Sequence, residues 1–152
     1  MATAVALEAG KQRVFACALD WPGWCRAGKD EDAALAALAA YVPRYAVVAE
    51  RAGIAFPGRA GKRLEVVERL RGSASTDFGV PGEVAGADGK RATRAQAERH
   101  TALVVASWAV FDEVRAGAPA ALRKGPRGGG RDRDKMVDHV LGAEAAYARK
   151  LG

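Results

Sequence analysis

Two histidines are the side chains in this sequence best suited to bind a metal. His139 lies in a helical pattern near the C-terminus, beside Asp138 and close to Glu144, and His100 lies in the preceding helical pattern. A divalent metal site needs three or four such nitrogen and oxygen ligands. Because the sequence has no spaced histidine pair, we favour His139 as a partly buried histidine hydrogen-bonded to a carboxylate or carbonyl. A metal site that includes His139 is the alternative.

Two cysteines are the candidate thiol nucleophiles. Arg26 follows Cys25 directly, and a neighbouring cation lowers a thiol pKa, but no histidine follows nearby to act as a base. Two cysteines are too few for a disulfide scaffold, and the absence of a C-x-x-C pair speaks against zinc. We therefore expect Cys17 and Cys25 to be reduced, partly buried thiols.

Two tryptophans flank a Pro-Gly turn. Trp21 and Trp24 are either exposed, as contact anchors or base-stacking platforms, or form a lid over the junction between a sheet and helices. We favour the lid. Further along, residues 72–90 are rich in Gly, Ser, Asp and Pro and contain Asp77 and Phe78. This segment is either a docked linker or the lining of a pocket between two halves, and we expect Phe78 to be buried.

The basic residues of the chain are concentrated in one stretch. Net charge is +6, and residues 123–135 contain six basic and two acidic side chains, a local net charge of +4. The basic residues are Arg123, Lys124, Arg127, Arg131, Arg133 and Lys135. Three successive glycines between Arg127 and Arg131 suit anion binding through backbone N–H groups. The stretch lacks the Walker spacing, which speaks against nucleotide hydrolysis. It is either a phosphate-binding loop or a solvated helix connector, and we favour the connector.

These side chains must be positioned by an α+β fold. Alternating apolar residues predict strands over 3–8, 13–19 and 64–70, with a short strand over 24–27. Helical spacing predicts helices over 31–52, bent near Pro43, over 93–116, and from 132 onward. We expect a small antiparallel sheet with one kinked helix, packed against a C-terminal antiparallel helix pair. The expected division is 1–72, a linker over 73–91, and 92–152.

The N-terminal part resembles HicB-like antitoxin domains. The resemblance is carried by the strand over 13–19, the turn Trp21-Pro22-Gly23-Trp24-Cys25, Gly28, and the acidic helix start at Asp30. It implies a β-β-β-α-β layer closed by the strand over 64–70. It also implies the binding and inhibition of a small RNase. The DNA-binding tail of that family is not recognisable.

The C-terminal part resembles the opening helix pair of DinB-like four-helix proteins. The run from Asp134 to Val140, followed by Glu144 and Tyr147, carries this resemblance. It implies a metal-ligand role for His139. The third and fourth helices have no counterpart in the sequence. The composite of both parts resembles actinobacterial proteins of unknown function.

We expect a non-enzymatic binding or regulatory module without a cofactor, because no catalytic carboxylate pair, triad or complete metal set is present. It should form a homo-oligomer or bind a partner protein through apolar stripes on its last two helices. The first helix has one stripe, made of Val104, Trp108, Phe111 and Val114. The last helix has two stripes, one made of Met136, Val140, Tyr147 and Leu151, and a second made of Val137 and Leu141. One alternative is a metal-dependent DinB-like enzyme of the thiol transferase type that uses His139. Another is a nucleic-acid binder that uses the basic stretch with Trp21 or Trp24.

No apolar run approaches the length of a membrane span, and the start of the chain has no signal-peptide pattern. We therefore expect a cytoplasmic protein without a membrane partner.

Overall fold

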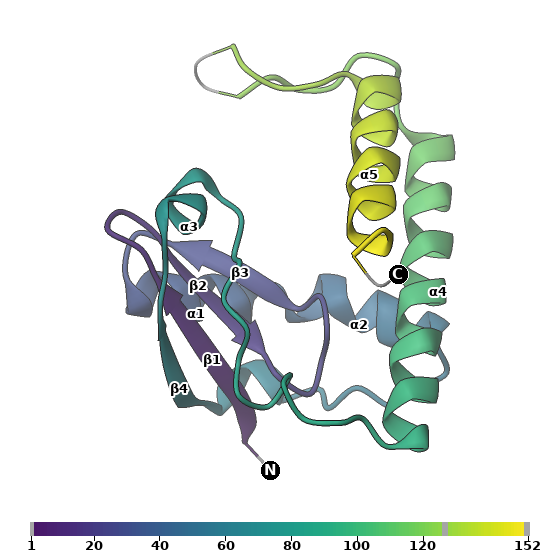
Figure 1. Ribbon diagram of the computed structural model, residues 1–152. Coiled ribbons are helices and arrows are strands. Elements are labelled where there is room, and N and C mark those ends of the chain that lie inside the picture. The colour runs from purple at the N-terminus through teal and green to yellow at the C-terminus, as the bar shows by residue number, and fades with distance from the viewer. Residues whose placement is uncertain (1, 126–127, 151–152) are drawn as a thin grey trace. The chain divides into compact units, whose positions relative to one another are not determined.

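A computed structural model describes residues 2–125 and 128–150 (Figure 1). The strands are β1 (Thr3–Ala9), β2 (Val14–Ala18), β3 (Cys25–Gly28) and β4 (Leu64–Arg71). The helices are α1 (Glu31–Ala40), α2 (Val42–Arg51), α3 (Ala74–Phe78), α4 (Arg94–Gly117) and α5 (Arg133–Ala148), with a 3-10 turn at Ala60–Lys62. The chain forms two compact units, residues 1–107 and 108–152, and the boundary between them along the chain falls inside α4. The α+β class predicted from the sequence is confirmed.

The sheet is mixed rather than antiparallel. Its strand order is β3-β2-β1-β4, with β1–β2 and β2–β3 antiparallel and β1–β4 parallel. The prediction of an antiparallel sheet was wrong because β4 returns after the crossover through α1 and α2. Such a crossover brings a strand back in the direction of its partner. The element order is otherwise the β-β-β-α-β order expected for the first 70 residues.

Local sequence signals place the helices of this crossover. The Asp30 side chain accepts a hydrogen bond from the backbone N–H of Ala33 (2.8 Å) and so caps α1. Pro43 lies in the first turn of α2, and α1 and α2 are bent by 48° relative to each other. The bend predicted near Pro43 is therefore confirmed. Gly28 is required beneath α1, because a Cβ there would lie 2.2 Å from the backbone nitrogen of Ala34.

Apolar side chains fill the space between the sheet and these two helices. The sheet contributes Val5, Leu7, Val14, Ala16 and Ala18, and the helices contribute Ala34, Leu38, Tyr45 and Ala49. Trp24 is fully buried among them, and its indole N–H donates to the carbonyl of Leu38 (3.0 Å). The Tyr45 hydroxyl donates to the carbonyl of Pro22 (2.9 Å), and burial raises the pKa of Tyr45 to about 12. The alternating strand pattern thus places apolar side chains in a core with aromatic residues, on the face of the sheet that α1 and α2 cover.

The other face of the sheet is covered by residues 72–92, which we call the strap (Figure 1). The sequence predicted no regular structure here, but the strap begins with the helical turn α3. The backbone N–H of Ser73 donates to the Thr76 hydroxyl (2.8 Å), which explains where this turn starts. Thr76 and Ala85 are buried against the sheet, so the strap is part of unit 1.

The second unit contains the end of α4, a connector, and α5. A capping box starts α4, because the side chains of Thr93 and Gln96 each accept the other's backbone N–H. Asp132 stands at the N-cap of α5, where the sequence predicted the helix to begin. Among the described residues from 108 to 150, none is buried.

Within the described chain, no single helix has both the length and the apolar composition needed to cross a membrane. The bent pair α1 and α2 meets these criteria only when the two helices are joined, and it carries the core residues Leu38 and Tyr45.

Candidate functional site

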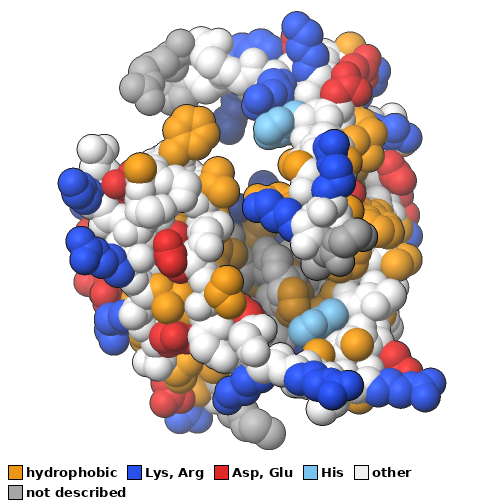
Figure 2. All heavy atoms as spheres, viewed as in Figure 1, with side chains coloured by type: hydrophobic (Ala, Val, Ile, Leu, Met, Phe, Trp, Pro, Cys, Tyr) orange, Lys and Arg blue, Asp and Glu red, His pale blue; other side chains and the backbone are white. Residues whose placement is uncertain are grey.

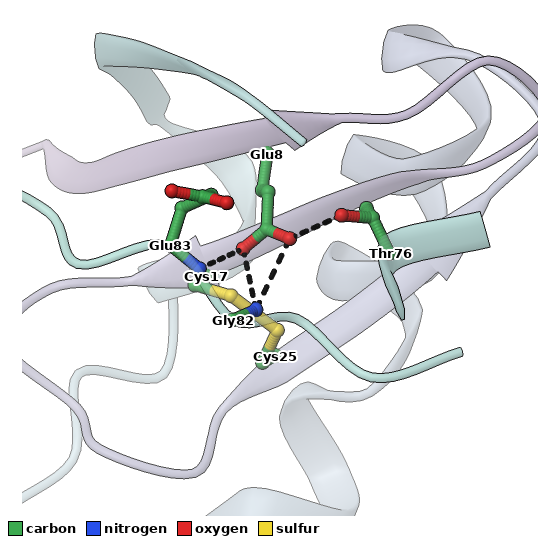
Figure 3. Close-up of a disulfide and its surroundings, with 6 residues drawn as sticks. All are labelled: Glu8, Cys17, Cys25, Thr76, Gly82 and Glu83. Atoms are coloured by element: carbon green, nitrogen blue, oxygen red, sulfur yellow. Dashed lines mark hydrogen bonds between the residues drawn. A yellow bond between two sulfur atoms is a disulfide. The ribbon is translucent and has the colours of Figure 1, made fainter. Parts of the chain in front are cut away.

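A buried carboxylate holds the centre of the strap against the sheet. Glu8 lies on β1, faces away from α1 and α2, and is only 4% exposed. One carboxylate oxygen accepts from the Thr76 hydroxyl (2.6 Å), and both accept from the backbone N–H of Gly82 (3.1 and 3.0 Å) (Figure 3). The N–H of Glu83 donates to the second oxygen (3.0 Å). A carboxylate removed from water needs such donors, and here the strap backbone supplies them.

Two further carboxylates hold the strap on either side of this central contact. Asp77 on α3 accepts the backbone N–H groups of Lys11 (3.1 Å) and Gln12 (2.8 Å) in the β1–β2 turn. The hydrogen bond from Gln12 is the main reason that the pKa of Asp77 lies below its usual value. Glu68 on β4 accepts the N–H of Gly86 with both oxygens (3.2 and 3.0 Å).

A β-bulge lets Glu68 reach the strap. The pairing of β1 with β4 shifts between Val5 and Ala6, so that Val66 pairs with Val5 but Glu68 pairs with Ala6. Without the extra residue, strict alternation would turn Glu68 to the helix side of the sheet and away from the strap.

Cys17 and Cys25 form a disulfide, so the prediction of two reduced thiols was wrong. They are directly opposite each other in the antiparallel β2–β3 pair, with Cα atoms 4.1 Å apart. Opposite residues of a non-hydrogen-bonded pair approach to about 4.5 Å, which brings two sulfur atoms within bonding reach. The number of cysteines could not predict this disulfide, because only the strand register shows that the turn at Trp21–Trp24 places Cys17 and Cys25 opposite each other.

The strap presents apolar side chains to solvent. Phe78 is 84% exposed, Val84 is 70% exposed and Val80 is 40% exposed. The expectation that Phe78 is buried was therefore wrong, since Asp77, Thr76 and Ala85 make the contacts that hold the strap. Asp77 also lines a hollow of about 370 Å³ at the end of the sheet, together with Lys11 and Arg71.

Both tryptophans of the Pro-Gly turn are buried, as the lid interpretation predicts. The Trp21 ring makes edge contacts with Tyr45 (6.0 Å between centroids) and Phe56 (4.7 Å). The Arg99 guanidinium lies 4.2 Å from the centre of the Trp21 ring, and Arg99 also donates to the carbonyl of Asp20. The outer side of the lid is thus covered by a cation.

The two candidate metal-binding histidines belong to different units. His139 is exposed on α5, rather than partly buried as expected, and His100 belongs to the other unit. Among the described residues, no group of three or more His, Cys, Asp or Glu side chains is placed to hold a metal. The metal role of His139 remains a prediction.

Part of the basic stretch is already paired. Lys124 forms an ion pair with Asp132, and Arg133 forms one with Asp134 (2.8 Å). Arg131 is exposed, and Arg127 lies outside the described residues. Lys and Arg side chains gather over the connector and the start of α5 (Figure 2), but the pairing reduces the positive charge left for an anion.

The helix pair leaves apolar surface exposed. The described apolar residues on α4 and α5 that are more than two-fifths exposed are Val104, Val105, Trp108, Val114, Leu141 and Tyr147. In unit 2, the Trp108 indole N–H donates to the Glu144 carboxylate (2.7 Å). On α4, Leu103 and Ala106 are buried, while Val104 and Trp108 of the predicted stripe are exposed. The contact of this stripe with a partner stays a prediction.

Comparison of the chain with protein-family models, with curated proteins and with solved structures finds no match. The HicB-like and DinB-like resemblances therefore remain hypotheses.

Sequence reasoning missed Glu8 and Glu68 altogether. A signal was present: Glu8 occupies the alternating face of β1 shared with Ala4 and Ala6, where a solvated strand face would carry several polar residues. A single carboxylate on an otherwise apolar face indicates a buried partner.

Proposed function

We propose that the protein is a non-enzymatic binding or regulatory module that associates with a second copy of itself through α4 and α5. The observation that carries the proposal is the absence of any buried side chain among the described residues of 108–150. Isolated helices of this length are marginal in water, because most helix stability in proteins comes from packing an apolar face.

The exposed apolar residues are suited to a helix interface. Leu141 (58% exposed) and Tyr147 (59% exposed) stand on α5, and Trp108 and Val114 stand on α4. Small residues between them on α5, such as Gly142 and Ala145, allow a second helix to approach closely. Two copies of a helix pair can form a four-helix core around a two-fold axis.

The test is the mass of the protein in solution, measured by light scattering at micromolar concentration. We expect a dimer for the parent chain and a monomer for Leu141→Glu. Val47→Glu is the matched control, because Val47 is also about half exposed but lies on α2, and this variant should remain a dimer. A monomeric parent chain would overturn self-association.

The element order of unit 1 supports the HicB-like hypothesis, for which the implied ligand is a small RNase. The two alternative functions, a metal-dependent enzyme and a nucleic-acid binder, predict different results. A DinB-like enzyme using His139 requires bound metal in the purified protein. A nucleic-acid binder requires salt-dependent retention on heparin that falls on Arg131→Ala. We also propose a cytoplasmic location, which cell fractionation tests.

A further inference from the structure

We propose that the Cys17–Cys25 pair is a site of reversible thiol–disulfide exchange with a dithiol reductant, and that its redox state controls how firmly the strap is held on the sheet. The inference does not depend on self-association, because both cysteines and the strap belong to unit 1.

The disulfide and the central anchor of the strap share one face of the sheet. Cys17 pairs with Ala6 across the β1–β2 ladder, and Glu8 is two residues further along β1. Residues directly opposite each other, and residues two apart on a strand, point to the same side. Figure 3 shows the disulfide among Glu8, Gly82 and Glu83, the groups whose hydrogen bonds hold the middle of the strap.

The disulfide is placed so that it can be reduced and can form again. Cys17 and Cys25 are both partly exposed, so a dithiol can attack without unfolding of the chain. One thiolate of the reductant attacks a sulfur of the pair and releases one cysteine thiolate. The second thiol of the reductant then resolves the mixed disulfide. The reductant becomes a disulfide, and Cys17 and Cys25 take up two electrons and two protons.

Re-oxidation is favoured by the register, because the two cysteines remain opposite each other in β2 and β3 whenever that pairing is intact. In a reducing compartment, disulfides are usually transient and serve catalysis or redox sensing. A cytoplasmic location would therefore expose this pair to reduction.

Reduction acts on the strap through the size of the sulfur pair. Two thiols need more room than a disulfide, since a covalent bond becomes a van der Waals contact, and the strap covers that face. The strap must therefore shift, which weakens the hydrogen bonds from the N–H groups of Gly82 and Glu83 to Glu8.

The experiment is hydrogen exchange by mass spectrometry on the intact chain, with and without dithiothreitol. We expect reduction to speed exchange in the segment around Gly82 and Glu83 by about tenfold, and to leave α2 unchanged. Alkylation in native buffer should then label both cysteines after reduction and neither before it.

The variant Cys17→Ser/Cys25→Ser supplies the control, because its two hydroxyls cannot form the bond. Its strap exchange should not respond to reductant. If that variant does not fold, Cys17→Ala/Cys25→Ala serves the same purpose. The proposal is overturned if native alkylation after reduction labels neither cysteine, or if strap exchange is the same in both redox states.

Discussion

The two faces of the sheet are covered by different kinds of contact. On one face, α1 and α2 bury Trp24, Leu38 and other apolar side chains. On the opposite face, an irregular strap is held by the carboxylates of Glu8, Glu68 and Asp77, which accept N–H groups of the backbone. The helix face buries the larger set of apolar side chains, and apolar burial is insensitive to pH. Hydrogen bonds to carboxylates depend on the charge of the carboxylate, and so on pH. The helix face should therefore set global stability, and the strap face should respond to pH and redox state.

The largest effect should come from the helix face. Replacing Trp24 by Ala removes a fully buried indole and the hydrogen bond that its N–H donates to the carbonyl of Leu38. We expect a loss of about 4 kcal/mol in the free energy of unfolding, measured by urea denaturation. Trp21→Ala should cost about 3 kcal/mol, because its ring is nearly buried and covered by Arg99. An unchanged urea midpoint for both variants would contradict the difference between the faces.

The helix face could be predicted from sequence because its signals are local. The alternation of Val14, Ala16 and Ala18, the Asp30 cap and the bend at Pro43 each depend on neighbouring residues. Leu64 and Val66 pack against the same core, as the alternation along their strand indicates. These elements needed no knowledge of the strand order.

The strap face could not be predicted, because its contacts join residues far apart in the chain. Glu8 and Gly82 are separated by 74 residues, and Gln12 and Asp77 by 65. The bulge that turns Glu68 toward the strap leaves no mark in the strand pattern of β4. The disulfide depends on register in the same way. Asp77 and Phe78 are neighbours in the segment that the sequence predicts to be a docked linker or the lining of a pocket, but they differ in the structure, since Asp77 holds the strap and Phe78 faces solvent.

An intermediate effect should come from the central anchor of the strap. Glu8→Gln keeps the size of the side chain but replaces one acceptor oxygen by an amide donor, which faces N–H groups of the strap. We expect a loss of about 1–3 kcal/mol in the free energy of unfolding.

Glu83→Gln is the matched control, because only its backbone N–H contacts Glu8 and its own side chain is exposed. This variant should unfold like the parent chain. Equal stability of Glu8→Gln and Glu83→Gln would show that the buried carboxylate does not hold the strap.

The smallest effect should come from Asp77, and it should depend on pH. The Asp77 carboxylate is ionised in the folded protein, and the hydrogen bond from Gln12 holds its pKa below the usual value of 3.8. A carboxyl whose pKa is lowered by folding stabilises the fold at pH values above its unfolded pKa. That contribution is lost as the pH falls through the folded pKa. Asp77→Asn should therefore lower the melting temperature slightly near neutral pH. The difference from the parent chain should shrink as the pH falls below 3.8.

Asp88→Asn is the control, because Asp88 lies in the same strap and is exposed, so the melting temperature of this variant should follow that of the parent chain at every pH. A difference between Asp77→Asn and the parent chain that stays constant down to about pH 3 would mean that the shape of the side chain, and not its charge, positions the β1–β2 turn.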